Sequence, residues 1–367
     1  MFKRSIQTAV LLLLSAYAAA SVDVQTGSTQ VIVPQQEWST CPKGSIAEFE
    51  NGDLQVLART YIKRSTDNGI SWTDANTYFS SYTYSYPSSG ALSFYGAVSA
   101  GSQSGLYLTT MLVSDDNGQT SFVKPSQVIL EGQWDGIVAS SHSQIIEIGG
   151  GVLLTSMYGK MVGDLSTQAF ALMSQDGGDS WYYLSTIAHD DENMPDGFNE
   201  SDLLVMPDGS IHCFVRAENS SSPDLYLCTS YDGGHTWSDY RYIFDKAASP
   251  HALLMSNGVI AVATGRPGNW LVFSSDNGDT WGDAVQYYTG PNPPDCSNYT
   301  SLAETTAGQL LAVYTRTDAS NNNLSEVAGT FFTVTPDVTA ANADFNDDGN
   351  VDWVDLYRMA DNWLGGN

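Results

Sequence analysis

Hydrophobic residues in this chain fall in short runs that meet in pairs at glycine turns. The same arrangement of apolar run, turn and apolar run recurs along the sequence, with turn glycines at Gly52, Gly151, Gly209, Gly258 and Gly308. A glycine between two such runs is typical of a β-hairpin, because glycine readily adopts the positive φ that tight turns need. The pattern therefore predicts a series of antiparallel hairpins.

A second motif, Ser-x-Asp-x-Gly-x-x-Trp, alternates with these hairpins, and we call it the Asp box. Complete copies begin at Ser65, Ser174, Ser230 and Ser274, and a copy without the tryptophan begins at Ser114. Successive copies lie 44 to 60 residues apart. The residue types suit a turn, in which Asp and Ser accept hydrogen bonds from backbone amides and the Trp packs beneath.

The two repeats run in phase. Each unit is predicted to contain four antiparallel strands, with the Asp box between the third and fourth strands, and this is the pattern of a propeller blade. Residues 21–333 have room for six such units. We therefore predict an all-β fold, a six-bladed β-propeller, followed by a linker at 334–343 and a short helical tail at 344–367.

Composition agrees with a folded β-protein and excludes some partners. The chain is 42% hydrophobic and 11% aromatic, too high for a disordered chain despite a formal net charge of -27. So acidic a protein is unsuited to binding nucleic acid or an anionic membrane surface, because both require clustered cations.

The N-terminus predicts export. Lys3 and Arg4 precede a short apolar run, and Ala18 to Ala20 offer a small-residue cleavage site, as in a signal peptide over residues 1–20. We therefore expect a secreted or extracellular protein, with the bacterial periplasm or cell surface as alternatives. Disulfides can form in such compartments. We expect one between Cys41 and Cys296, closing the ring of blades, and a less certain one between Cys213 and Cys228.

The repeat itself indicates a functional rim. Positions nine residues before the turn glycines start the innermost strands and hold Lys43, His142, Glu200, Ser249 and Tyr299. Positions seven or eight residues after those glycines hold Arg59, Tyr158, Arg216, Arg266 and Arg316. Four of the chain's eight arginines fall in this second set. Arginine binds carboxylates with a bidentate fork, so a substrate with an acidic sugar is expected here.

Asp boxes at this spacing resemble those of the sialidase (neuraminidase) superfamily of six-bladed propellers. The resemblance implies a glycosidase in which arginines hold the substrate carboxylate, a Tyr is the nucleophile, a Glu activates that Tyr, and an Asp is the acid/base. Glu200 and Arg216 resemble the family's Glu–Arg pair, Arg266 in Gly-Arg-Pro-Gly resembles its third arginine, and Tyr299 resembles its nucleophile.

Two positions depart from the family pattern. Lys43, in Cys-Pro-Lys-Gly, stands where the family's first arginine is expected, and the stretch before the first Asp box, residues 57–64, contains no carboxylate. The proton donor is therefore expected elsewhere, with candidates His142, Asp135 and the acidic loop Asp190, Asp191, Glu192 and Asp196.

Two other functions remain open. His142 together with Tyr and Arg side chains would suit β-elimination on a uronate polysaccharide, with Arg neutralising the carboxylate and another side chain removing the C5 proton. A carbohydrate-binding propeller without turnover is the third possibility. Product analysis separates the three functions. A lyase product absorbs in the ultraviolet, a hydrolase product does not, and a binding protein makes no product.

The tail carries its own motif. Its spacing matches an EF-hand-type calcium loop, with expected Ca²⁺ ligands Asp344, Asn346, Asp348, Asn350, Asp352 and Asp355 and with Gly349 at the sharp turn. The segment resembles one repeat of a type I dockerin, whereas dockerins normally carry two. The resemblance implies a cohesin-like or cell-surface partner.

Overall fold

The computed structural model describes residues 21–37, 44–80, 83–85, 90–95, 99–100, 105–130, 132, 134–138, 143–218, 223–290, 299–318 and 321–336. These residues form β-strands and turns without a helix, which confirms the all-β prediction. Within those ranges no helix is long and apolar enough to span a membrane. The predicted signal peptide and calcium-binding tail lie outside the described residues.

Three sheets are built from four consecutive antiparallel strands each. The first contains β2 (Ser45–Glu48), β3 (Leu54–Ala58), β4 (Tyr61–Ser65) and β5 (Thr73–Asp74). The second contains β16 (Phe198–Val205), β17 (Ile211–Glu218), β18 (Pro223–Ser230) and β19 (Arg241–Phe244). The third contains β20 (His251–Leu254), β21 (Ile260–Gly265), β22 (Asn269–Ser274) and β23 (Gly282–Tyr288).

A fourth sheet joins the two ends of the described chain. It consists of β24 (Thr300–Thr306), β25 (Gln309–Asp318), β26 (Asn321–Pro336) and, outermost, β1 (Val22–Glu37). β1 and β26 pair antiparallel from Val22 opposite Pro336 to Glu37 opposite Leu324. Ring closure in the described residues therefore rests on this long strand pair. The predicted Cys41–Cys296 disulfide lies outside the described residues.

The remaining strands form one ten-stranded sheet. One half contains β6 (Thr83–Ser85), β7 (Ala91–Phe94), β8 (Ser99–Ala100), β9 (Leu106–Ser114) and β10 (Phe122–Ile129). The other half contains β11 (Trp134–Val138), β12 (Ile146–Glu147), β13 (Leu153–Met161), β14 (Gln168–Ser174) and β15 (Ser180–Ala188). The halves are joined where β10 and β15 pair in parallel over three residue pairs.

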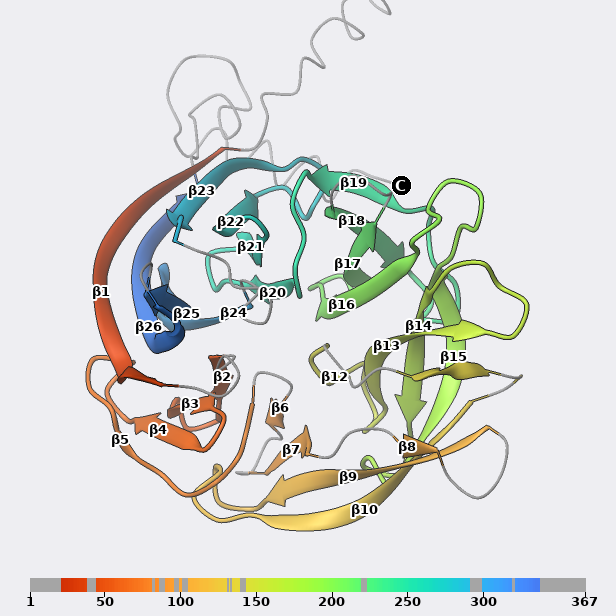
Figure 1. Ribbon diagram of the computed structural model, residues 1–367, viewed down its shortest axis with the longest axis horizontal. Coiled ribbons are helices and arrows are strands. Elements are labelled where there is room, and N and C mark those ends of the chain that lie inside the picture. The colour runs from red at the N-terminus through yellow and green to blue at the C-terminus, as the bar shows by residue number, and fades with distance from the viewer. Residues whose placement is uncertain are drawn as a thin grey trace, which may run out of the picture.

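This parallel pairing changes the predicted architecture. The described residues form five sheets, not six separate blades, because hydrogen bonds between the outer strands fuse two groups of strands into one sheet. Figure 1 shows the sheets arranged radially around a common centre, with β2, β12, β16, β20 and β24 innermost. The hairpin turns and Asp boxes fall where the repeats predict them, the boxes between β4 and β5, β9 and β10, β14 and β15, β18 and β19, and β22 and β23.

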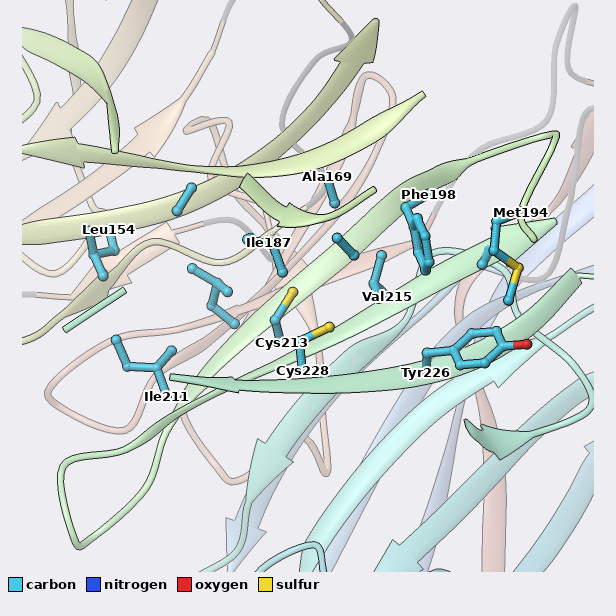
Figure 2. Close-up of a cluster of buried hydrophobic side chains, with 14 residues drawn as sticks. Leu154, Ala169, Ile187, Met194, Phe198, Ile211, Cys213, Val215, Tyr226 and Cys228 are labelled. Atoms are coloured by element: carbon cyan, nitrogen blue, oxygen red, sulfur yellow. The ribbon is translucent and has the colours of Figure 1, made fainter. Parts of the chain in front are cut away.

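Apolar side chains fill the space between neighbouring sheets. One cluster joins Leu154 and Ala169 of the ten-stranded sheet to Cys213 and Val215 of the next sheet (Figure 2). Cys213 lies directly opposite Cys228 in the β17–β18 register, and both are buried free thiols. The expected disulfide between them is therefore absent, and burial raises the pKa of both thiols, that of Cys228 to about 12.

Asp boxes also connect the sheets. The carbonyl oxygen of each box glycine accepts a hydrogen bond from a side chain of the preceding group of strands. The donor–acceptor pairs are Gln30–Gly69, Thr77–Gly118, Ser126–Gly178, Ser185–Gly234 and Arg241–Gly278. Within each box the Ser hydroxyl accepts the amide of the glycine, as Ser65 does from Gly69 at 2.9 Å. The motif is thus both a turn and a contact between neighbours.

Candidate functional site

The Glu200 side chain lies where three sheets meet. Its residue is only 5% exposed on β16. One carboxylate oxygen, Oε1, accepts a hydrogen bond from the hydroxyl of Tyr299, the residue just before β24. The other, Oε2, accepts from Arg216 Nη1 of β17 at 2.9 Å and from the amide of Ser249, which precedes β20, at 2.8 Å. The structure thus brings together Tyr299, Glu200 and Arg216, three residues that the sequence placed at one site.

This arrangement suits proton removal from a phenol. A carboxylate that accepts the Tyr hydroxyl hydrogen is placed to take that proton, while the adjacent Arg216 charge and the Ser249 amide stabilise the ionised carboxylate. The Ser249 amide was not predicted as a donor, because sequence patterns show side chains and not the backbone groups that a turn exposes. Ser249 has φ 36°, which belongs to such a turn.

Arg266 lies at the end of β21, in the position on its hairpin that Arg216 has on β17. Its amide donates to Gly268 O at 2.9 Å across a turn that contains a cis Arg266–Pro267 peptide bond. The Nε atom of Arg266 is buried and has no hydrogen-bond partner among the described residues. A buried donor of this kind favours an acceptor such as a ligand oxygen.

Other predicted rim residues have different surroundings. Arg316 pairs with Glu326, directly opposite in the β25–β26 register, its Nε lying 2.8 Å from Glu326 Oε1. This ion pair fixes the Arg316 guanidinium to its own sheet, and a role of Arg316 in substrate binding stays a prediction. Arg59 is exposed in the turn between β3 and β4, with φ 55°. Tyr158 is half-buried on β13, opposite Ala169. Lys43 and His142 lie outside the described residues.

Asp190 and Asp191, the first two residues of the acidic loop, are not suited to donate a proton. Asp190 accepts hydrogen bonds from Asn193, from backbone amides and from the Tyr240 hydroxyl, and its pKa lies well below the usual range. Asp191 accepts from Ser166 and Leu165, and these bonds lower its pKa to about 2. Both are ionised at neutral pH and hold loops together. Glu192, Asp196 and Asp135 are exposed.

A carboxyl group that the sequence analysis did not single out lies two residues after Glu200. Asp202 is 1% exposed and accepts hydrogen bonds at 2.8 Å from the Gln144 amide and side chain and from the Ala252 amide. Burial raises its pKa to about 7. Its alternation with Glu200 on one strand was the available signal, since residues i and i+2 share a face.

Known proteins share this fold. Residues 147–325 match the BNR repeat-like domain. The anhydrosialidase of Macrobdella decora is 26% identical over 196 residues, which cover 47% of this chain and 24% of that protein, so the chain spans about a quarter of that relative.

Two solved structures align over most of the chain. A Dyadobacter fermentans protein of unknown function has a TM-score of 0.66 at 17% identity and covers 85% of this chain and 99% of its own. The GH93 α-L-arabinofuranosidase of Fusarium graminearum, in complex with arabinobiose, has a TM-score of 0.62 at 15% identity and covers 83% of this chain and 97% of its own. Identities this low establish the fold alone. About half of the chain thus matches a BNR repeat-like domain, part of it is similar in sequence to an anhydrosialidase, and its fold is shared with a GH93 glycosidase.

Proposed function

We propose that this chain is a secreted, sialidase-like glycoside hydrolase that removes a terminal acidic sugar from a glycan. The observation that carries the proposal is the Tyr299 hydroxyl hydrogen-bonded to the buried Glu200 carboxylate, which Arg216 holds from its other oxygen. Most glycosidases use two carboxylates, and sialidases instead use a Tyr nucleophile. A neutral phenol approaches an anionic sugar without charge repulsion.

In the proposed reaction, the Tyr299 oxygen bonds to the anomeric carbon while the glycosidic bond breaks, and the phenol proton passes to Glu200. The leaving oxygen takes a proton from a general acid, for which the candidates are His142, Asp135, Glu192 and Asp196. Water then displaces the tyrosine oxygen, which recovers its proton from Glu200, and the second proton of that water restores the acid. Arg266, with its buried Nε, is the proposed partner of the substrate carboxylate, together with Lys43.

A second candidate is hydrolysis of a neutral arabinan, favoured by the likeness to a structure solved with arabinobiose. The usual two-carboxylate mechanism would need a second acid beside Glu200. Asp202, the next carboxyl group on β16, is buried and already accepts hydrogen bonds from Gln144 and Ala252, so it is not accessible to a substrate. The local chemistry therefore favours the tyrosine mechanism. β-Elimination on a uronate polysaccharide would depend on His142 as a catalytic residue. Carbohydrate binding without turnover is the remaining alternative.

Replacing Tyr299 with Phe tests the proposal. The variant loses the nucleophile, so kcat/KM on the true substrate is expected to fall at least about 100-fold. Tyr182→Phe is the control, because that side chain is 48% exposed on β15. Both proteins are incubated with sialosides, arabinan and uronate polysaccharides, and products are followed by mass and ultraviolet absorbance.

Release of a sialic acid that Tyr299→Phe abolishes supports the proposal. Cleavage of arabinan only, an absorbing unsaturated product, or full activity of Tyr299→Phe would each contradict it.

We propose in addition that the tail binds Ca²⁺ through Asp344 and the other loop ligands and attaches the enzyme to a cohesin-like or surface partner. The support for this proposal is the spacing of oxygen ligands in the sequence.

A further inference from the structure

A cavity lies between two neighbouring Asp boxes, away from Glu200. It has a volume of about 1050 Å³ and lies between the sheet of β16–β19 and the sheet of β20–β23. Its walls include Tyr231, Tyr242, Asp239, Arg241, Asn277 and Asp279. Figure 1 shows β19 and β22 in these adjacent sheets. His212, which also lines the cavity, is four residues before Arg216 on β17, so the cavity lies about 13 Å along the strand from the catalytic candidates.

Two tyrosine rings are presented to solvent at this cavity. Tyr231 is 81% exposed and Tyr242 is 52% exposed. Tyr242 is held by an edge-on contact with Tyr226, whose ring centroid lies 5.9 Å away. Large exposed aromatic side chains gathered at a cavity indicate a binding site, since a tyrosine combines an apolar face with a polar hydroxyl.

The polar groups of the cavity limit the ligand's charge. Asp239 and Asp279 are exposed carboxylates. Arg241 is the cation in the lining, and its guanidinium is bonded to the backbone carbonyls of Gly278 and Asp279. His212 is 5% exposed, and burial lowers its pKa to about 4, so it is neutral near pH 7. An anionic ligand would meet two carboxylates and no uncommitted cation.

We propose that this cavity is a second glycan-binding site for an uncharged saccharide. The sugar rings would stack on Tyr231 and Tyr242, and the sugar hydroxyls would donate hydrogen bonds to the carboxylates of Asp239 and Asp279. The ligand class differs from the acidic sugar proposed for the Glu200 site, so the two sites recognise different parts of a polysaccharide. Binding at this cavity does not depend on the proposed reaction, and with that reaction it would hold the enzyme on its polymer while the Glu200 site reacts.

Affinity electrophoresis of the full chain tests the site. Native gels contain linear arabinan, galactan or arabinoxylan as neutral polymers, or polygalacturonate as the acidic comparison. We expect at least one neutral polymer to retard the protein. Tyr231→Ala and Tyr231→Ala/Tyr242→Ala should weaken that binding roughly tenfold or more, because exposed aromatic anchors contribute most of the affinity of such sites.

The control variant is Tyr182→Ala, which removes an exposed tyrosine from β15 and should leave the retardation unchanged. Tyr231 is so exposed that its loss should not affect folding, which thermal unfolding checks. The proposal is overturned if no neutral polymer retards the protein, if polygalacturonate alone does so, or if Tyr231→Ala migrates like the unmodified protein. Failure of Tyr299→Phe to abolish catalysis would leave this result unaffected.

Discussion

At the scale of single residues, two carboxyl groups on one strand have different roles. Glu200 accepts hydrogen bonds from the Tyr299 phenol, from Arg216 and from the Ser249 amide, which belong to three different groups of strands. Asp202, one alternation further along, is bonded to Gln144 and Ala252 from two other groups of strands. The hydrogen bonds that Asp202 accepts stabilise its carboxylate, yet burial is the larger influence and raises its pKa. Glu200 therefore contacts the candidate nucleophile, whereas Asp202 links β16 to two neighbouring groups of strands.

The raised pKa of Asp202 predicts a pH dependence of stability. Its ordinary pKa is near 3.9 and its folded value about 7, so the folded state binds the proton more tightly. The contribution of Asp202 to the free energy of unfolding is fully present below about pH 4 and is lost as the pH rises toward 7. The loss is at most about 4 kcal/mol. Asp202→Asn cannot titrate.

The free energy of unfolding of both proteins is measured by urea denaturation at pH 4.5 and pH 7.5. Relative to Asp202→Asn, the unmodified protein should have a lower free energy of unfolding at pH 7.5 than at pH 4.5. A difference that is independent of pH, or that shifts the other way, would show that Asp202 is ionised when buried.

At the scale of elements, the Asp box explains how neighbouring groups of strands stay in register. The hydroxyl of its Ser and the carboxylate of its Asp satisfy the amides inside the turn, as Ser114 and Asp116 do for Gly118 and Thr120. That leaves the glycine carbonyl directed at the adjacent strands, where a side chain donates to it. Donors differ among Gln, Thr, Ser and Arg, so this contact shows no sequence motif of its own.

Removing one such donor should weaken the fold. Ser126 is 5% exposed and donates to Gly178 O at 2.7 Å. Ser126→Ala leaves that carbonyl without this donor, which should lower the free energy of unfolding by about 1–3 kcal/mol. Ser28→Ala is the control, because Ser28 is an exposed residue of β1. Chemical denaturation measures both, and equal stabilities would mean that the connection between sheets contributes nothing measurable.

At the scale of the whole molecule, β1 closes the ring by pairing with β26, so the two ends of the propeller segment lie side by side. β1 buries the adjacent residues Ile32 and Val33 against the core and leaves Val31 46% exposed, and its register with β26 shifts between Val31 and Val33. The proposed acidic-sugar site and the proposed neutral-glycan cavity would act on one polymer from different positions.

The tail supplies a prediction at this scale. Its acidic loop should bind Ca²⁺, since carboxylate oxygens at EF-hand spacing repel one another without a cation. Calorimetry of the full chain should detect one Ca²⁺ site, and Asp348→Ala should remove it. Asp115→Ala, a change at an acidic position of the propeller, is the control. The loop assignment would be refuted if titration with Ca²⁺ gave no heat of binding for the unmodified protein, or if Asp348→Ala bound Ca²⁺ equally well.

The sequence alone determined the hairpins, the turn glycines and the Asp boxes, because these depend on contacts within a few residues. Glycine at positive φ and Ser or Asp beside an amide have the same local chemistry in every copy. The position of Glu200 and Tyr299 on one rim also followed from the repeat, although their contact spans 99 residues.

Only the tertiary structure decided how those elements are joined and which rim residues form ion pairs with other residues of the chain. Arg316 binds Glu326 because the β25–β26 register sets them opposite each other, and β10 joins β15 because their outer edges meet. The burial of Asp202 and the cavity beside Tyr231 likewise depend on neighbouring sheets. Register, burial and contacts between sheets arise from packing over long sequence separations, and a local pattern carries no record of them.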